Sequence, residues 1–134
     1  MKILHTADLH LGKKLNKASR LDEQCAVIKE LAELADVEDI DVILIAGDVF
    51  DASVPPAEAE RVFYRSILTL AERGRAVIAL AGNHDDERRL CAAKPLAEVQ
   101  GIVLAGELDY TAIGGGETRS DPTPPPSLYA LADA

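Results

Sequence analysis

Three polar loops of the sequence hold carboxylate, imidazole and amide side chains directly after apolar stretches. They are Asp8-Leu9-His10, the loop from Gly47 to Asp51 (GDVFD) and the loop from Gly82 to Asp85 (GNHD). A mixture of carboxylate, imidazole and amide oxygen donors suits divalent ions such as Mn²⁺, Fe²⁺ or Zn²⁺. If the loops meet in space, they predict a metal centre able to hydrolyse a phosphoester.

Each loop by itself also has an ordinary structural interpretation. The Asp8 loop could be a helix cap, and His10 could be a surface histidine. Asn83 could be a turn former, and GDVFD could be a polar connection between a strand and a helix. The three loops nevertheless occur in one order, each directly after an apolar stretch, and this combination favours the metal centre.

The loops need a scaffold that brings them together, and the hydrophobic pattern predicts a parallel sheet. The expected strands are residues 2–7, 42–46, 76–81 and 102–105. Helical patterns separate them: one begins near Arg20, one begins around Ser53 and Pro55-Pro56, and one covers 86–93 before Pro95. This alternation is typical of an α/β fold, a parallel sheet flanked by helices, whose strand ends share one edge.

Length and composition agree with such a fold. The 134 residues, 48% hydrophobic and 28% charged, fit one soluble globular domain. The N-terminus shows no secretory segment and no apolar run of membrane length, so we expect a cytoplasmic protein with no membrane partner. Cys25 and Cys91 lie far apart in helix-like surroundings and are expected to be reduced and buried.

Basic residues stand beside the first and third loops. They are Lys13, Lys14, Lys17, Arg20, Arg88 and Arg89. The net charge of −9 argues against nucleic-acid binding through the overall field, but not through a local patch. Either cluster alone could be a solvated surface, whereas together, next to the loops, they suit contacts with DNA phosphates.

The loops resemble the motifs of a known family. The patterns DxH, GDxxD and GNHD are similar to the first three motifs of the calcineurin-like metallophosphoesterases. The opening MKILHTADLHLGKK, with GDVFD and GNHD, resembles more narrowly the SbcD-type nuclease subunits of bacterial DNA-repair complexes. The resemblance covers about residues 1–110 and implies the N-terminal half of a metallophosphoesterase α/β sandwich.

The resemblance also implies two divalent metal ions, with Mn²⁺ expected. The ligands would be Asp8 and His10 for the first ion, Asn83 for the second, and Asp48 bridging both. His84 would act at the scissile phosphate, Asp51 would orient His84, and Asp85 would have a supporting structural role. The attacking group would be a metal-activated water.

The sequence departs from the family in its later part. The family's remaining ligands are histidines in a GH and a GHxH motif, and no histidine follows His84. We therefore interpret residues 1–113 as a partial nuclease domain (a fragment, a truncated gene product or a split subunit) and residues 114–134 as a Gly/Pro-rich flexible loop or tail. A half-built site should hold its ions weakly, so we expect the isolated chain to be weakly active or inactive.

The predicted function is metal-dependent hydrolysis of DNA, as the exonuclease and endonuclease subunit of an SbcCD-like repair complex. Its partners would be DNA, an SbcC-like coiled-coil ATPase subunit and a second copy in a homodimer. One alternative is a phosphoesterase of the same superfamily that acts on a small phosphodiester or phosphoprotein. A second alternative is a non-catalytic assembly or regulatory fragment, which the missing later histidines support.

Overall fold

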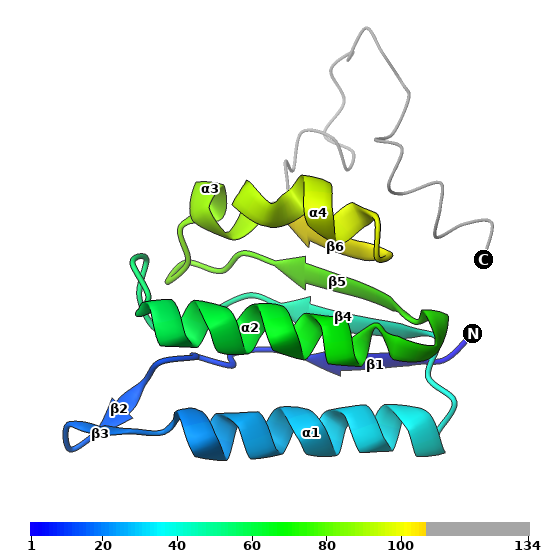
Figure 1. Ribbon diagram of the computed structural model, residues 1–134, viewed down its shortest axis with the longest axis horizontal. Coiled ribbons are helices and arrows are strands. Elements are labelled where there is room, and N and C mark those ends of the chain that lie inside the picture. The colour runs from blue at the N-terminus through cyan, green and yellow to red at the C-terminus, as the bar shows by residue number, and fades with distance from the viewer. Residues whose placement is uncertain (107–134) are drawn as a thin grey trace, which may run out of the picture.

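The computed structural model describes residues 1–106, and these form a parallel sheet with flanking helices (Figure 1). The four strands lie in the order β1-β4-β5-β6, and every pair is parallel. Their bounds are β1 (Ile3–Thr6), β4 (Val42–Ala46), β5 (Ala76–Leu80) and β6 (Ile102–Ala105). The α/β class predicted from the sequence is confirmed.

The helices occupy the connections between successive strands. They are α1 (Leu21–Val37), α2 (Ala57–Leu70), α3 (Glu87–Leu90) and α4 (Lys94–Glu98), with 3₁₀ turns at Glu72–Gly74 and Cys91–Ala93. Among the described helices, none combines the length and the apolar character needed to span a bilayer. The predicted domain boundary at residue 113 lies outside the described residues.

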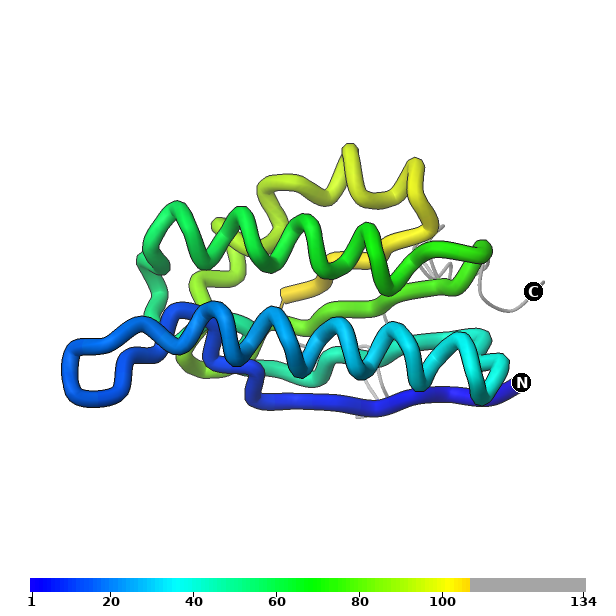
Figure 2. The backbone as a smooth tube through the Cα atoms, turned by 60° about the horizontal axis from the view of Figure 1, so that its bottom comes forward, coloured from blue at the N-terminus to red at the C-terminus, as the bar shows by residue number. Residues whose placement is uncertain are grey.

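The strand order places the helices on one face of the sheet. The strands advance in a single direction, and right-handed crossovers then put every connecting helix on the same side. Figure 2 shows α1 and α2 running side by side across that side. Alternate strand residues point into this core and are buried, namely Ile43, Ile45, Val77, Ala79, Ile102 and Leu104.

The other face of the sheet is also apolar. Leu44, Ile78, Leu80 and Val103 point to it, and each is only half-buried. At the sheet edge, Ile3 is 54% exposed. Parallel strands with apolar residues on both faces are typical of sheets covered on both sides, whereas the described helices cover one.

Three local details differ from the sequence-based expectation. The basic stretch after the first loop forms a hairpin of β2 (Lys14–Leu15) and β3 (Ala18–Ser19), because Asn16 and Lys17 both adopt positive φ angles, which is the geometry of a tight hairpin turn. The region predicted as one helix over 86–93 holds α3 and a 3₁₀ turn. Pro95 begins α4 instead of merely ending a helix, since the first helical turn needs no N–H donor there.

The predicted burial of both cysteines is wrong for one of them. Cys25 lies on the exposed side of α1, one position beyond the residues that face the core, while Cys91 is half-buried. Both thiols are free, as expected. The start of α2 is also later than predicted, because Pro55 and Pro56 precede the helix at Ala57.

The core reaches directly beneath the polar loops. Phe63 of α2 is fully buried and packs edge-on against Phe50, with ring centroids 5.3 Å apart. Phe50 belongs to the GDVFD loop and forms a β-bridge with Leu11 of the first loop. Aromatic packing therefore connects α2 to two of the three loops.

Replacing Phe63 by alanine should destabilise the protein strongly, because it leaves a cavity beneath Phe50. We expect the free energy of unfolding to fall by about 3–5 kcal/mol, measured by urea denaturation. Leu68→Ala on the same helix is the matched control, since Leu68 is 51% exposed and should cost less than about 1 kcal/mol. Equal losses in the two variants would contradict this account of the core.

Candidate metal centre

The first two loops continue the pairing of β1 and β4 beyond the ends of those strands. Asp8 N donates to Gly47 O at 3.1 Å, His10 N to Asp48 O at 3.0 Å, and Leu11 N to Val49 O at 2.9 Å. The loops thus run side by side at the carboxyl edge of the sheet, where open α/β folds build their sites.

Three residues of these loops adopt left-handed backbone conformations. The φ angles are 54° at Asp8, 44° at His10 and 46° at Asp48. Such angles cost free energy for any residue with a side chain and persist only where surrounding structure enforces them, often at functional sites. The chain conformation here is therefore held by the tertiary structure and not by local preference.

The same three residues bring their ligand atoms together. One donor atom from each of Asp8, His10 and Asp48 lies within 4.8 Å of the others. His10 Nε2 is 3.9 Å from Asp8 Oδ1 and 3.8 Å from Asp48 Oδ2. Because nitrogen and oxygen ligands lie about 2.0–2.2 Å from a divalent ion such as Zn²⁺, atoms at this spacing can share one ion. Two carboxylates and an imidazole therefore fit a divalent metal.

His84, from the loop after β5, stands against this group. Its ring meets the His10 ring edge to face, with centroids 5.1 Å apart, and its backbone N–H donates to Asp48 Oδ1 at 3.0 Å. His84 is exposed, which leaves its ring open to a substrate. Asn83 lies exposed beside it on the same turn.

Asp51 is placed between the two histidines. Its carboxylate Oδ1 lies 3.3 Å from His10 Nδ1, and its backbone carbonyl lies 3.2 Å from His84 Nδ1. Asp51 thus approaches His84 through the main chain, whereas its side chain faces His10. Although Asp51 is this close, His10 Nδ1 is buried without a partner of hydrogen-bonding geometry among the described residues.

Asp85 holds the second and third loops together. Its Oδ2 accepts hydrogen bonds from Val49 N at 2.9 Å and Gly82 N at 2.8 Å, and its Oδ1 accepts one from Phe50 N at 2.7 Å. The sequence indicated only an unspecified structural role for Asp85. Its position at the end of GNHD was the available signal, but its partners lie up to 36 residues away.

Gly82 allows the close approach of these two loops. A Cβ atom on Gly82 would lie 2.2 Å from Asp48 N and 2.3 Å from Asp48 Oδ1, distances that no side chain tolerates. Any substitution must therefore displace Asp48. The glycine of GNHD is thus required by the position of an acidic ligand.

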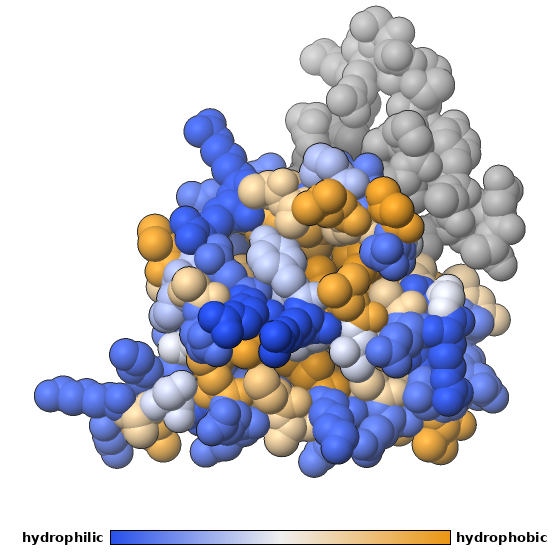
Figure 3. All heavy atoms as spheres, in the orientation of Figure 1, coloured by the Kyte–Doolittle hydropathy of each residue, from blue (hydrophilic) through white to orange (hydrophobic). Residues whose placement is uncertain are grey.

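The predicted DNA-contacting cations divide into two groups. Lys14 and Lys17 are exposed on the β2–β3 hairpin, where Figure 3 shows hydrophilic side chains projecting beyond the body of the molecule. Arg89 instead pairs with Glu60 of α2, its Nε and Nη2 donating at 2.6 and 3.1 Å, and this hydrogen-bonded carboxylate raises the pKa of Arg89.

Of the remaining cations, Lys13 and Arg88 are exposed, whereas Arg20 donates through Nε to Glu23 at 3.0 Å. The structure therefore favours the hairpin and Arg88 over Arg89 as the cations that remain available to an anion.

Comparison with known proteins agrees with the geometry. Residues 1–126 match the family described as calcineurin-like phosphoesterase. The chain is similar to the SbcD subunit of the SbcCD nuclease of Bacillus subtilis, with 52% identity over 107 residues, covering 79% of this chain and 27% of that protein.

The corresponding SbcCD nuclease subunits of two other bacteria are also similar. The Rhodobacter capsulatus protein is 38% identical over 110 residues, covering 81% of this chain and 27% of that protein. The Escherichia coli K12 protein is 42% identical over 85 residues, covering 63% and 21% respectively. The chain thus spans about a quarter of the length of the curated relatives that it matches.

Replacing Asp85 by asparagine should separate the loops. The amide keeps one acceptor oxygen, so at least one of the three N–H groups is left facing an NH₂ group, at a cost of about 1–3 kcal/mol. We expect this loss in chemical denaturation, together with faster hydrogen exchange of the Phe50 amide.

Asp22→Asn is the control for Asp85→Asn, because it removes the same charge from the exposed first turn of α1. It should leave the Phe50 amide unchanged. Unaltered protection of that amide in Asp85→Asn would contradict the bridging role of Asp85.

Proposed function

The chain belongs to the calcineurin-like phosphoesterase family, and we propose that it forms the first part of a metal-dependent DNA nuclease of the SbcD type. The observation that supports this most directly is the group of Asp8, His10 and Asp48, with His84 beside it. The reaction is hydrolysis of DNA phosphodiesters, by exonuclease action on double strands and endonuclease action on single strands.

In this proposal the site takes two divalent ions, with Mn²⁺ as the expected metal. The ligands are Asp8 and His10 for the first ion, Asn83 for the second, and Asp48 for both. When bound, such ions polarise the phosphoryl oxygens and supply an activated water as the nucleophile. The carboxylates and the His10 imidazole fix the position at which this chemistry occurs.

The remaining polar groups orient and protonate. Asp51 lies against His10 through its carboxylate and against His84 through its carbonyl. If His84 Nδ1 carries a proton and donates it to that carbonyl, Nε2 is the ring atom left to face the scissile phosphate. A protonated Nε2 there can donate to the leaving oxygen.

The exposed lysines supply the proposed DNA contact. Lys14 and Lys17 project from the hairpin, and Lys13 lies at its base, next to the first ligand loop. Arg20 and Arg88 extend the same polyphosphate-binding surface, to which Arg89 contributes less because Glu60 holds it. Base readout plays no part, since phosphate contacts carry no sequence information.

The proposed setting is a cytoplasmic repair complex. The relatives are named as subunits of the SbcCD nuclease, which supports an SbcC-like coiled-coil ATPase and a second copy of the chain as partners. A second candidate function is a non-catalytic assembly fragment. It is favoured by one specific observation, that no histidine follows His84 to complete the ligand set.

Calorimetric titration with Mn²⁺ tests the metal site. We expect a weak site in the wild-type chain that is lost in Asp48→Ala, because Asp48 contributes to both ions. Asp22→Ala serves as the charge-matched control and should bind as the wild type does. Two tight sites would refute weak binding by the chain alone, and no binding at all would favour the non-catalytic fragment.

DNA binding tests the substrate. Replacing Lys14 and Lys17 together by alanine should weaken binding of duplex DNA and reduce the slope of log K against log salt by about 2, roughly one per lost phosphate contact. Lys29→Ala is the control, because Lys29 lies on α1 and pairs with Glu33. Binding that ignores both salt and the hairpin lysines would favour a small phosphodiester as the substrate.

A further inference from the structure

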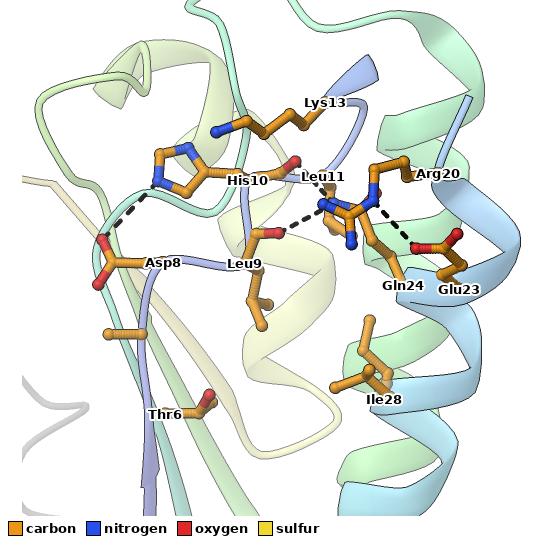
Figure 4. Close-up of a pocket in the computed structure, with 12 residues that line it drawn as sticks. Thr6, Asp8, Leu9, His10, Leu11, Lys13, Arg20, Glu23, Gln24 and Ile28 are labelled. Atoms are coloured by element: carbon orange, nitrogen blue, oxygen red, sulfur yellow. Dashed lines mark hydrogen bonds and ion pairs between the residues drawn. The ribbon is translucent and has the colours of Figure 1, made fainter. Parts of the chain in front are cut away.

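Gln24 lies outside the predicted site, in the first turns of α1, yet its side chain reaches the first ligand loop. Its amide Nε2 donates to the backbone carbonyls of Leu9 at 3.1 Å and His10 at 2.8 Å. Its Oε1 accepts from the backbone N–H of Gly12 at 3.2 Å. Figure 4 shows Gln24 reaching from the helix toward the loop.

These three hydrogen bonds use the particular chemistry of an uncharged amide. A glutamine side chain offers two N–H donors and one carbonyl acceptor. Both donors point to loop carbonyls and the acceptor to a loop N–H, so every group has a partner. A carboxylate at this position would set negative charge against two carbonyl oxygens, and an apolar side chain would make none of the contacts.

The loop has little other support on the side that faces α1. A cavity of about 440 Å³ separates the two, lined by Leu9, Lys13 and Val27 among others. Leu11 is buried and anchors the end of the loop. The stretch in between contains the two left-handed residues Asp8 and His10, so its backbone direction depends on the polar bridge across the cavity.

We propose that Gln24 is a positioning residue that holds the Asp8–Gly12 loop in its metal-binding conformation and thereby sets the affinity of the first ion. This inference rests on the proposed metal site and assigns Gln24 no contact with the ion. Supporting residues that orient metal ligands change metal affinity by about 10- to 100-fold when they are replaced.

Two near-isosteric variants test the proposal in the full chain. Gln24→Met keeps the volume and removes all three hydrogen bonds, whereas Gln24→Glu keeps the acceptor for Gly12 N and removes both donors. Gln100→Glu is the matched control, because it introduces the same charge at an exposed position after α4, away from the site. Each protein is titrated with Mn²⁺ by calorimetry, and its melting temperature and Gly12 amide exchange are measured without metal.

We expect both Gln24 variants to bind Mn²⁺ about 10- to 100-fold more weakly while they remain folded, with Gln100→Glu unchanged. Gly12 amide exchange should accelerate in Gln24→Met and less so in Gln24→Glu. Lowered melting temperatures with unchanged Mn²⁺ affinity would reduce Gln24 to a purely structural role and overturn the proposal.

The titrations also separate this proposal from the function on which it rests. A wild-type chain that binds Mn²⁺ through Asp48, together with Gln24 variants that bind equally well, overturns only the role of Gln24. A wild-type chain that takes up no Mn²⁺ overturns both the positioning role and the metal site.

Discussion

The hydrogen bonds of the Asp85 carboxylate are the constraint on which the rest of the site depends. One side chain accepts N–H groups from Val49, Phe50 and Gly82, so the loops after β4 and β5 cannot move independently. Hydrogen bonds to a charged acceptor are roughly twice as strong as neutral ones. With the loops joined, Asp48 accepts the N–H of His84, and the acidic ligand and the exposed imidazole become fixed relative to each other.

The site is strained locally and supported from outside. Asp8, His10 and Asp48 all have positive φ angles, which these residue types tolerate better than most but still at a cost. The support comes from different parts of the fold: backbone pairing between the first two loops, Asp85 behind the second, and Gln24 of α1 behind the first. Strain at a metal site is therefore balanced by hydrogen bonds that do not involve the ligand atoms.

The sequence predicts the sheet and the meeting of the loops because both follow from local pattern. Apolar runs mark the strands, and parallel strands must bring their ends to one edge, so Asp8 and Asp48 could be placed together without coordinates. Side-chain pairings across the fold lack such a signal. Nothing local to Arg89 indicates Glu60, 29 residues earlier, and nothing near Asp51 indicates that its carboxylate faces His10. The hairpin turn at Asn16-Lys17 was missed because it contains no glycine, the usual indicator of positive φ.

The two proposed ions differ in how far the described residues provide for them. Asp8, His10 and Asp48 supply three donors around one position, which is a protein ligand set that can hold a divalent ion with water completing the coordination. The second ion is represented only by Asp48 and Asn83, and it needs donors beyond these. Because the apolar sheet face opposite the helices is also only half-buried, the second ion and the second face call for the same thing, further polypeptide packed on that side of the sheet. The affinity of the first ion is then a property of this chain, and the affinity of the second depends on what covers the sheet.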